Sequence, residues 1–114
     1  MTIPSSRTNF TIGQGATWSV TVTYADSNGT GIDITGYSVR AEMKRNFSDA
    51  TAAQTITCAL TTPASGLITM SLTATQTKAL SGDYLYDLEI ESAGGAVTRL
   101  LNGTITIDKE VTVE

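Results

Sequence analysis

The sequence contains no histidine and only one cysteine, Cys58. Histidine is the commonest general base near neutral pH and the commonest nitrogen ligand for metal ions, and it activates serine and cysteine nucleophiles. Its absence, together with the single cysteine, excludes an ordinary zinc site, an internal disulfide and the usual hydrolase arrangements. We therefore expect a protein that is not an enzyme, and we assign no residue to a catalytic, cofactor-binding or metal site.

Positive charge and long apolar runs are also scarce. The chain has seven Lys and Arg residues against eleven Asp and Glu residues, a formal net charge of −4, and only Lys44 and Arg45 are adjacent basic residues. The basic residues are too few and too scattered to form a patch that binds the phosphates of a nucleic acid or a lipid surface. We therefore expect neither nucleic acid nor an anionic membrane as a partner. No run approaches the roughly 18 apolar residues of a membrane span, and the first residues lack the apolar stretch of a secretory signal. We expect a soluble chain made in the cytoplasm.

Threonine is the most frequent residue, and with valine and isoleucine it dominates the periodic segments. Such β-branched residues suit pleated strands better than helices. Apolar and polar residues alternate, as in half-buried strands, over residues 17–24, 37–44, 54–60, 67–72 and 82–91. Turn signals separate the segments, among them Asn28-Gly29, where both residues tolerate positive φ, and Gly94-Gly95.

From these patterns we predict an all-β fold, an antiparallel two-sheet β-sandwich of immunoglobulin-like type, with a small jelly roll or barrel as the alternative. Seven to eight short strands with turn signals about every ten residues fit this architecture. The alternation stops near residues 74–80, where we expect one short helical turn. We expect residues 1–8 to form a flexible N-terminal arm and residues 9–114 to form a single β-sandwich domain.

The segment "GDYLYDLEIE", residues 82–91, contains a row of carboxylates. On a strand, alternation sends two sets of side chains to opposite faces, Tyr84, Tyr86, Leu88 and Ile90 to one, and Asp83, Leu85, Asp87, Glu89 and Glu91 to the other. Successive same-face residues lie ~6.6 Å apart, a separation that suits inverting glycosidases, but any two such acids on a strand share it, and a bare sheet face offers no cleft. We interpret the acids as a solvated face, and Glu89 lies opposite Arg99 if the following turn is a three-residue loop.

Two other features are candidate sites. The loop "DSNGTGID", residues 26–33, carries Asp26, Asn28 and Asp33 and is the best local candidate for calcium, but it lacks the twelve-residue pattern and terminal Glu of an EF-hand. We favour a plain hairpin turn there. The aromatic residues are all assigned inward by alternation, which favours core packing over a sugar-stacking platform; they are Trp18, Tyr24, Tyr37, Tyr84 and Tyr86.

Three motifs carry a resemblance to a known family: "DITGY" at residues 33–37, "TKALSGDYLYDL" at 77–88 and "RLLNGTITIDKEVT" at 99–112. With Gly66 and Leu72 ahead of the second motif, the pattern resembles a small β-sandwich domain of tailed-bacteriophage virion proteins, often from phages of cyanobacteria and marine bacteria. The matching residues are Asp33, Thr35, Gly36, Tyr37, Gly66, Leu72, Thr77, Leu80, Gly82, Tyr84, Tyr86, Asp87, Leu88, Arg99, Leu100, Leu101, Gly103, Val111 and Thr112. The resemblance covers the chain from about residue 10 onward.

This resemblance implies a structural part of a virion without catalytic residues, in the tail, baseplate or neck, with a capsid decoration protein on the head surface as the alternative. An alternative of another class is a carbohydrate- or receptor-binding module. The expected partners are other virion proteins and copies of the chain itself. We expect the two ends, residues 1–10 and 109–114, to add strands to a neighbour's sheet edge, so that multimers depend on them.

Overall fold

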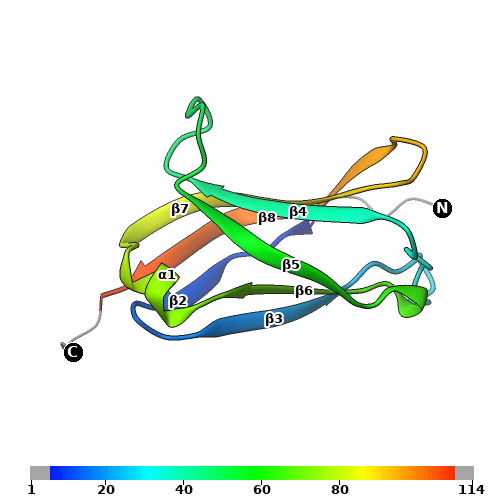
Figure 1. Cartoon of the computed structure of the whole chain (residues 1–114), viewed down its shortest axis with the longest axis horizontal. Helices are drawn as coiled ribbons and strands as arrows, with labels where there is room; N and C mark the ends of the chain where they lie inside the picture. Colours follow the sequence, from blue (N-terminus) through cyan, green and yellow to red (C-terminus); the bar gives the residue numbers. More distant parts are fainter. Residues whose placement is uncertain (1–5, 110–114) are drawn as a thin grey trace.

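The structure is a computed structural model that describes residues 6–109, and these residues form an all-β fold with two short helical segments (Figure 1). The strands are β1 (Ser6–Arg7), β2 (Phe10–Gly13), β3 (Trp18–Thr23), β4 (Ser38–Lys44), β5 (Gln54–Thr62), β6 (Leu67–Leu72), β7 (Gly82–Glu91) and β8 (Val97–Asp108). The helical segments are η1 (Pro63–Ser65) and α1 (Ala74–Lys78). The β-rich composition therefore predicted the class of fold correctly.

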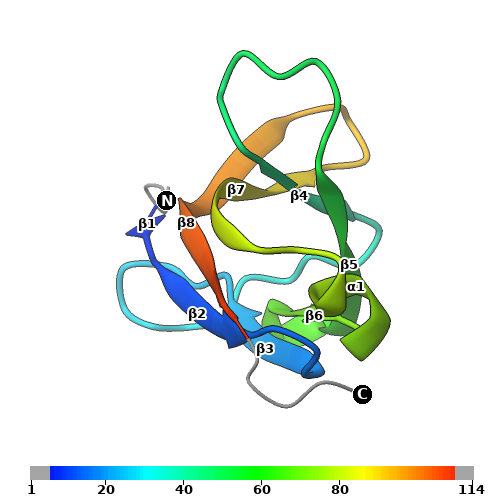
Figure 2. The ribbon, with the colours of Figure 1, turned by 90° about the vertical axis from the view of Figure 1, so that its left-hand side faces the viewer.

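The strands form one hydrogen-bonded sheet in the order β1-β8-β7-β4-β5-β6-β3. β2 lies off this path and pairs with β8. β1 and β2 run parallel to β8, whereas every other pairing is antiparallel, so the sheet is mixed. Figure 2 shows that the sheet curls around its own inner face and is nearly a barrel. A curl of this kind lets one sheet enclose a core without a second, separate sheet.

The predicted division into two separate antiparallel sheets is wrong. The nine-residue strand β5 joins both halves of the path, because it pairs with β4 through residues 54–56 and with β6 through residues 57–62. Periodicity identified β5 as a strand but carries no information about which neighbours it has along its length. The parallel pairing of β1 and β2 with β8 is the second departure from the prediction.

The core lies inside the curl, and alternation places the side chains that fill it. The row of four on β7 that the sequence predicted to be buried is fully covered, with exposed fractions of 0–5% for Tyr84, Tyr86, Leu88 and Ile90. On β3 the inward row is only half-buried, and it comprises Trp18, Val20 and Val22. The central strand β7 has neighbours on both sides whereas β3 has one, which accounts for the difference.

The free edges of the curl, β2 and β3, are joined by aromatic side chains, and within residues 6–109 no strand ladder links them. The Phe10 ring lies 5.3 Å from the Trp18 ring in an edge-to-face arrangement and 5.7 Å from the Tyr86 ring. Such pairs bury a large apolar area and add a modest geometric preference. The two ends of the sheet therefore meet through side chains in place of backbone hydrogen bonds.

The boundary predicted between an arm and the domain lies too far along the chain. Ser6 and Arg7 pair with β8, and the Thr8 N–H donates to the Asn102 carbonyl at 2.8 Å. The strand that the arm was expected to lend to a neighbour is therefore used, from residue 6 onward, in the chain's own sheet. Residues 1–5 and 110–114, with the predicted C-terminal strand, lie outside the described residues.

The predicted helical turn is confirmed as α1, between β6 and β7. Thr73 caps it with a capping box, in which its hydroxyl accepts from the Gln76 N–H and the Gln76 side chain accepts from the Thr73 N–H. The buried Thr77 hydroxyl bonds to the Ala16 carbonyl at 2.8 Å. This contact fixes the helix against the turn that precedes β3.

The loop at residues 26–33 is a tight turn, as predicted, but its backbone differs from the prediction in one respect. Gly29 has a positive φ of 85°, whereas Asn28 does not, so only one residue of the pair uses the left-handed region. The Asp26 N–H donates to the Thr30 carbonyl and the Gly29 N–H to the Asp26 carbonyl. A single glycine in this region is typical of a three-residue hairpin loop.

Candidate interaction surface

The outer face of the curled sheet is divided by charge. Strands β3, β5 and β6 carry no charged residue, and their outer faces are rich in threonine and serine. Strands β4, β7 and β8 carry Arg40, Glu42, Lys44, Asp83, Asp87, Glu89, Glu91, Arg99 and Asp108. The predicted row of acids thus lies in the centre of a face that also contains basic residues, which we call the charged face.

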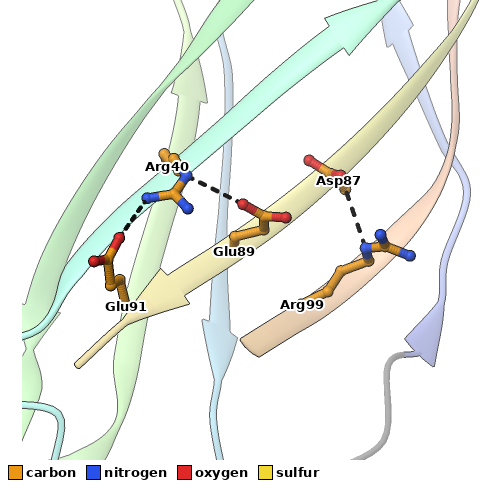
Figure 3. Close-up of polar contacts among 5 residues, drawn as sticks. All are labelled: Arg40, Asp87, Glu89, Glu91 and Arg99. Carbon is orange, nitrogen blue, oxygen red and sulfur yellow. Dashed lines mark hydrogen bonds and ion pairs between the residues drawn. The ribbon is translucent and has the colours of Figure 1, made fainter. Parts of the chain in front are cut away.

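Arg40 on β4 binds two acids of the row on β7 (Figure 3). Its Nε donates to Glu89 Oε1 at 3.1 Å, and its Nη1 donates to Glu91 Oε1 at 3.1 Å. The hydrogen bond to Glu91, followed by the charge of Glu89, raises the pKa of Arg40. Because the three side chains are in contact with water, these ion pairs stabilise the fold little and chiefly set the pattern of charge on the surface.

Asp87 is the acid of this row whose pKa is raised by its surroundings. Partial burial of its carboxylate is the first cause of its raised pKa, and the negative charge of Glu89 is the second. Glu42 lies directly opposite it on β4 and raises the pKa further, whereas Arg99, at 3.8 Å from Oδ2, lowers it. Asp87 therefore lies beside the negative charge of Glu42 on β4 and the positive charge of Arg99 on β8. Figure 3 shows its contact with Arg99.

The predicted register of the β7–β8 hairpin is confirmed, because Glu89 lies opposite Arg99. The Ser92 N–H donates to the Ala96 carbonyl, which leaves the predicted three-residue loop. The ion pair that this register suggested is different, however. A register shift after Leu88 makes Leu100 an extra residue on β8, and the Arg99 side chain reaches Asp87 while Glu89 binds Arg40.

A depression of about 260 Å³ lies on the charged face, and its lining includes Phe47, Leu85, Asp87 and Arg99. Sites for small molecules are usually larger, roughly 300–1,000 Å³, and mostly apolar. A second depression, of about 370 Å³, is lined mainly by the charged residues around Arg40 and Glu89. Shallow, charge-lined hollows of this kind suit contact with another macromolecule better than enclosure of a ligand.

Phe47 is the feature of this surface that sequence reasoning missed. Its side chain is 88% exposed in the β4–β5 loop, which projects beyond the sheet in Figure 1. Arg45 fixes the start of the loop, because its guanidinium donates to the Ser81 and Asp83 carbonyls and stacks 4.1 Å from the centre of the Tyr84 ring. An aromatic residue in a loop without alternation, "NFSDATAA", was the available signal. Phe47 thus presents a large apolar side chain to solvent, and aromatic residues of this kind are enriched in protein interfaces.

The candidate calcium loop uses its carboxylates locally. Asp26 Oδ1 accepts from the Asn28 and Thr30 N–H groups at 2.9 and 3.0 Å. Asp33 Oδ1 accepts from the Thr35 hydroxyl and N–H, and these bonds lower the pKa of Asp33. These are turn-forming bonds of the kind that aspartate makes with its own backbone. Within residues 6–109, no group of three or more Asp, Glu or Cys residues is placed to hold a metal ion.

The tyrosines on β7 pack in the core, and each hydroxyl has a partner. The Tyr84 oxygen accepts from the Ser81 N–H at 3.1 Å, and the Tyr86 hydroxyl donates to the Thr8 carbonyl at 2.7 Å. Burial raises the pKa of Tyr86 to about 12. Trp18, Tyr24 and Tyr37 are partly buried against the core. These five aromatics are therefore placed inward, as alternation predicted.

Cys58 is half-buried on β5, and burial raises the pKa of its thiol to about 11. A thiol with a raised pKa holds little of the reactive thiolate near neutral pH.

No protein family matches this sequence, and no curated protein is significantly similar to it. In the part of the chain that is described, no helix has the length and apolar character needed to cross a membrane.

Proposed function

We propose that this chain is a non-enzymatic structural protein of a bacteriophage virion, which assembles through protein–protein contacts in the tail, baseplate or neck region. The proposal begins from the resemblance of its motifs to a virion β-sandwich domain. The observation that carries it further is that the motif residues hold key positions in the fold, so the resemblance concerns the scaffold and not a chemical site.

The contacts of individual motif residues support this reading. Tyr84, Tyr86 and Leu88 are buried in the core. At Gly103, φ is 153° and a Cβ atom would lie 2.3 Å from the Thr8 carbonyl oxygen, so the N-terminal segment can run this close to β8 only beside a glycine. Thr77 fixes α1 to the turn before β3 through its bond to Ala16. A shared set of such residues is the pattern expected of a shared fold.

The immunoglobulin-like classification is part of this proposal. It is supported by the order of the strands, in which β1/β2, β8, β7 and β4 are neighbours, as are β5, β6 and β3. It is also supported by the combination of a parallel pairing between the first strands and the last one with antiparallel pairing elsewhere. The continuous strand β5 is where this chain departs from two independent sheets.

The surface is suited to repeated contacts. The charged face on β4, β7 and β8, the uncharged face on β3, β5 and β6, and the projecting Phe47 differ in chemistry, so one subunit can bind neighbours of different kinds. Other virion proteins and copies of the chain are the proposed partners. A carbohydrate- or receptor-binding role is less well supported, because the five aromatics that could form a sugar platform are buried or half-buried.

Immunogold labelling of virions of the phage that encodes this chain, with an antibody against the purified protein, tests the proposal. We expect label on the tail, baseplate or neck. Label on the head surface would instead indicate a capsid decoration protein, and particles that carry no label and no trace of the chain by mass spectrometry would contradict a virion role altogether. A glycan array with the purified protein addresses the alternative class, and specific binding that is lost on substituting Phe47, the one large exposed aromatic among the described residues, would favour it.

A further inference from the structure

Within residues 6–109, the edge strand β3 lacks the features by which proteins usually protect an open sheet edge. Its sequence, "WSVTVT", contains no charge and no proline, and its pairing with β6 is regular from Trp18 to Thr23. Edge strands are normally blunted by lysine, proline, a bulge or a covering segment, because an open row of backbone groups binds other strands. Figure 1 shows β3 along the lower boundary of the molecule, and Figure 2 shows β2 beyond its second side, with no strand ladder between the two within residues 6–109.

The register with β6 identifies the backbone groups that are open. The Tyr24 N–H donates to the Gly66 carbonyl at 2.8 Å, and Trp18 lies opposite Leu72 in the same register. In an antiparallel ladder alternate residues direct both backbone groups to one neighbour. Even-numbered residues of β3 therefore bond to β6, and Ser19, Thr21 and Thr23 direct their N–H and C=O groups to the open side.

We propose that β3 is a homotypic interface, at which it pairs antiparallel with β3 of a second copy about a two-fold axis that passes through Thr21. Thr21 then lies opposite Thr21 of the partner, and Ser19 lies opposite Thr23. The three open residues of each strand satisfy those of the other, which gives six backbone hydrogen bonds between the copies. The result is a continuous sheet in the order β5-β6-β3-β3-β6-β5.

The side chains are self-complementary in this register. On the outer face threonine meets threonine or serine, pairs that are favourable across strands. The Thr21 hydroxyl already bonds to that of Thr69 at 3.3 Å, and Thr69 bonds to Thr61, so the pairing extends an existing row of hydroxyls. On the inner face Val20 lies opposite Val22, and Trp18 lies opposite Tyr24. These residues are half-buried in one copy, and the partner covers more of their apolar surface.

A second copy fits this edge better than another occupant because charge does not oppose it. Neither β3 nor its neighbours β6 and β5 carry a charged residue, so two copies meet without repulsion although each chain has a net charge of −4. The pairing also uses every open residue of β3. A two-fold contact closes after two subunits. The inference stands independently of the proposed virion role.

Sedimentation velocity over a range of concentrations tests the interface with two matched variants. Thr21→Lys places two ammonium groups on residues whose Cα atoms are about 5.5 Å apart across the dyad. We expect it to weaken dimerisation at least tenfold. Thr57→Lys adds the same charge to the outer face of β5, where Thr57 is also exposed, and should leave the dimer intact. A wild-type chain that stays monomeric up to about 1 mM, or equal dimerisation of both variants, would overturn the proposal.

Nitroxide labels determine the geometry and do not rely on a charge change. In a Cys58→Ala background, a label on Thr21→Cys should give strong dipolar broadening, because the two-fold axis brings position 21 against itself. A label on Thr57→Cys should report a separation of about 25–30 Å, which corresponds to five strand spacings and the offset along the strands. Dimers without broadening at position 21 would contradict the two-fold pairing and indicate instead a head-to-tail addition of another segment.

Discussion

At the scale of single residues, Gly103 shows how the N-terminal segment depends on the last strand. Its φ of 153° is a conformation that other residues rarely adopt, and the Thr8 carbonyl occupies the space where a side chain would begin. The same carbonyl accepts a hydrogen bond from the Tyr86 hydroxyl, so Thr8 is held in place from the core side as well. A glycine in the middle of an alternating strand, which normally weakens it, is here required by a close approach of the backbone.

Gly103→Ala should therefore destabilise the protein by at least about 2 kcal/mol, from backbone strain and from displacement of residues 6–9. The measurement is urea unfolding followed by circular dichroism. Gly94→Ala is the matched control, since Gly94 lacks a positive φ and a Cβ atom added there would lie 3.9 Å from the nearest side-chain atom. Equal stability of the two variants would show that Thr8 does not approach Gly103 this closely.

Asp87 and Asp33 should respond to pH in opposite directions. The pKa of Asp87 is raised by burial and by Glu89, so the native state holds this proton to a higher pH than the unfolded chain does, and stability is lost as pH rises through the raised pKa. The pKa of Asp33 is lowered by its bonds from Thr35, so its contribution is present above the usual value of 3.8 and is lost as pH falls through the lowered pKa.

Asp87→Asn should consequently be more stable than the wild type at pH 7, and Asp33→Asn should be less stable. Both differences should shrink as the pH falls toward about 2, where all the carboxyl groups are protonated in both states. Urea midpoints at neutral and acidic pH provide the comparison. Differences of the same sign at neutral pH, or differences that persist in acid, would contradict the assignment.

At the scale of elements, the five-residue helix α1 is too short to be stable by itself and depends on its cap and its tertiary contact. Thr77 is fully buried, and its hydroxyl reaches the Ala16 carbonyl in the turn before β3. The contact links β6–α1–β7 to the start of the edge strand. The absence of alternation in "TATQTKAL" predicted the helical turn, but its tertiary partner is 61 residues away in sequence.

Thr77→Val should cost about 1 kcal/mol, because it keeps the shape of the side chain but removes the hydrogen bond that the buried Thr77 hydroxyl donates to the Ala16 carbonyl. Thr75→Val is the control, since it places the same β-branched residue at an exposed position of the same helix. Thermal unfolding should show a clear loss for the first variant and little change for the second. A comparable loss in both would indicate that helix propensity, and not the buried bond, determines the effect.

At the scale of the whole molecule, closure of the curled sheet depends on Phe10. This residue on β2 contacts Trp18 on β3 and Tyr86 on β7, and so connects the two free edges across the core. Because no strand ladder joins β2 to β3 within residues 6–109, side-chain packing is what holds these edges together beyond the short turn that connects them. The sheet is in this sense an open barrel (Figure 2), and the contacts of Phe10 with Trp18 and Tyr86 bridge its gap.

Phe10→Ala should destabilise the fold by about 2 kcal/mol, roughly half the usual cost for a fully buried phenylalanine, because Phe10 is half-buried. The fluorescence of Trp18, the only tryptophan, should change at the same time because its ring loses a neighbour. Phe47→Ala makes the same substitution at a side chain that is 88% exposed and should change neither stability nor fluorescence. An unchanged Phe10→Ala variant would mean that the edges are held by other contacts.

The local features of this protein follow from its sequence alone. Alternation and β-branched residues predicted the strands and the inward rows, and Gly94-Gly95 predicted the hairpin turn between β7 and β8. These features depend on neighbours in sequence, where a period of two or a glycine has one physical meaning. For the same reason the acids of β7 could be predicted to lie on a solvated face.

How the strands join is a property of the folded molecule. The tertiary structure shows that β5 pairs with both β4 and β6, and that β1 and β2 run parallel to β8. It also shows that Arg40 forms an ion pair with Glu89, and Arg99 with Asp87. Each of these depends on partners distant in the chain, whose choice follows from the packing of the whole core and not from any local pattern. The exposure of Phe47 and the open edge of β3 arise in the same way, because a residue is free or covered only with respect to the rest of the fold.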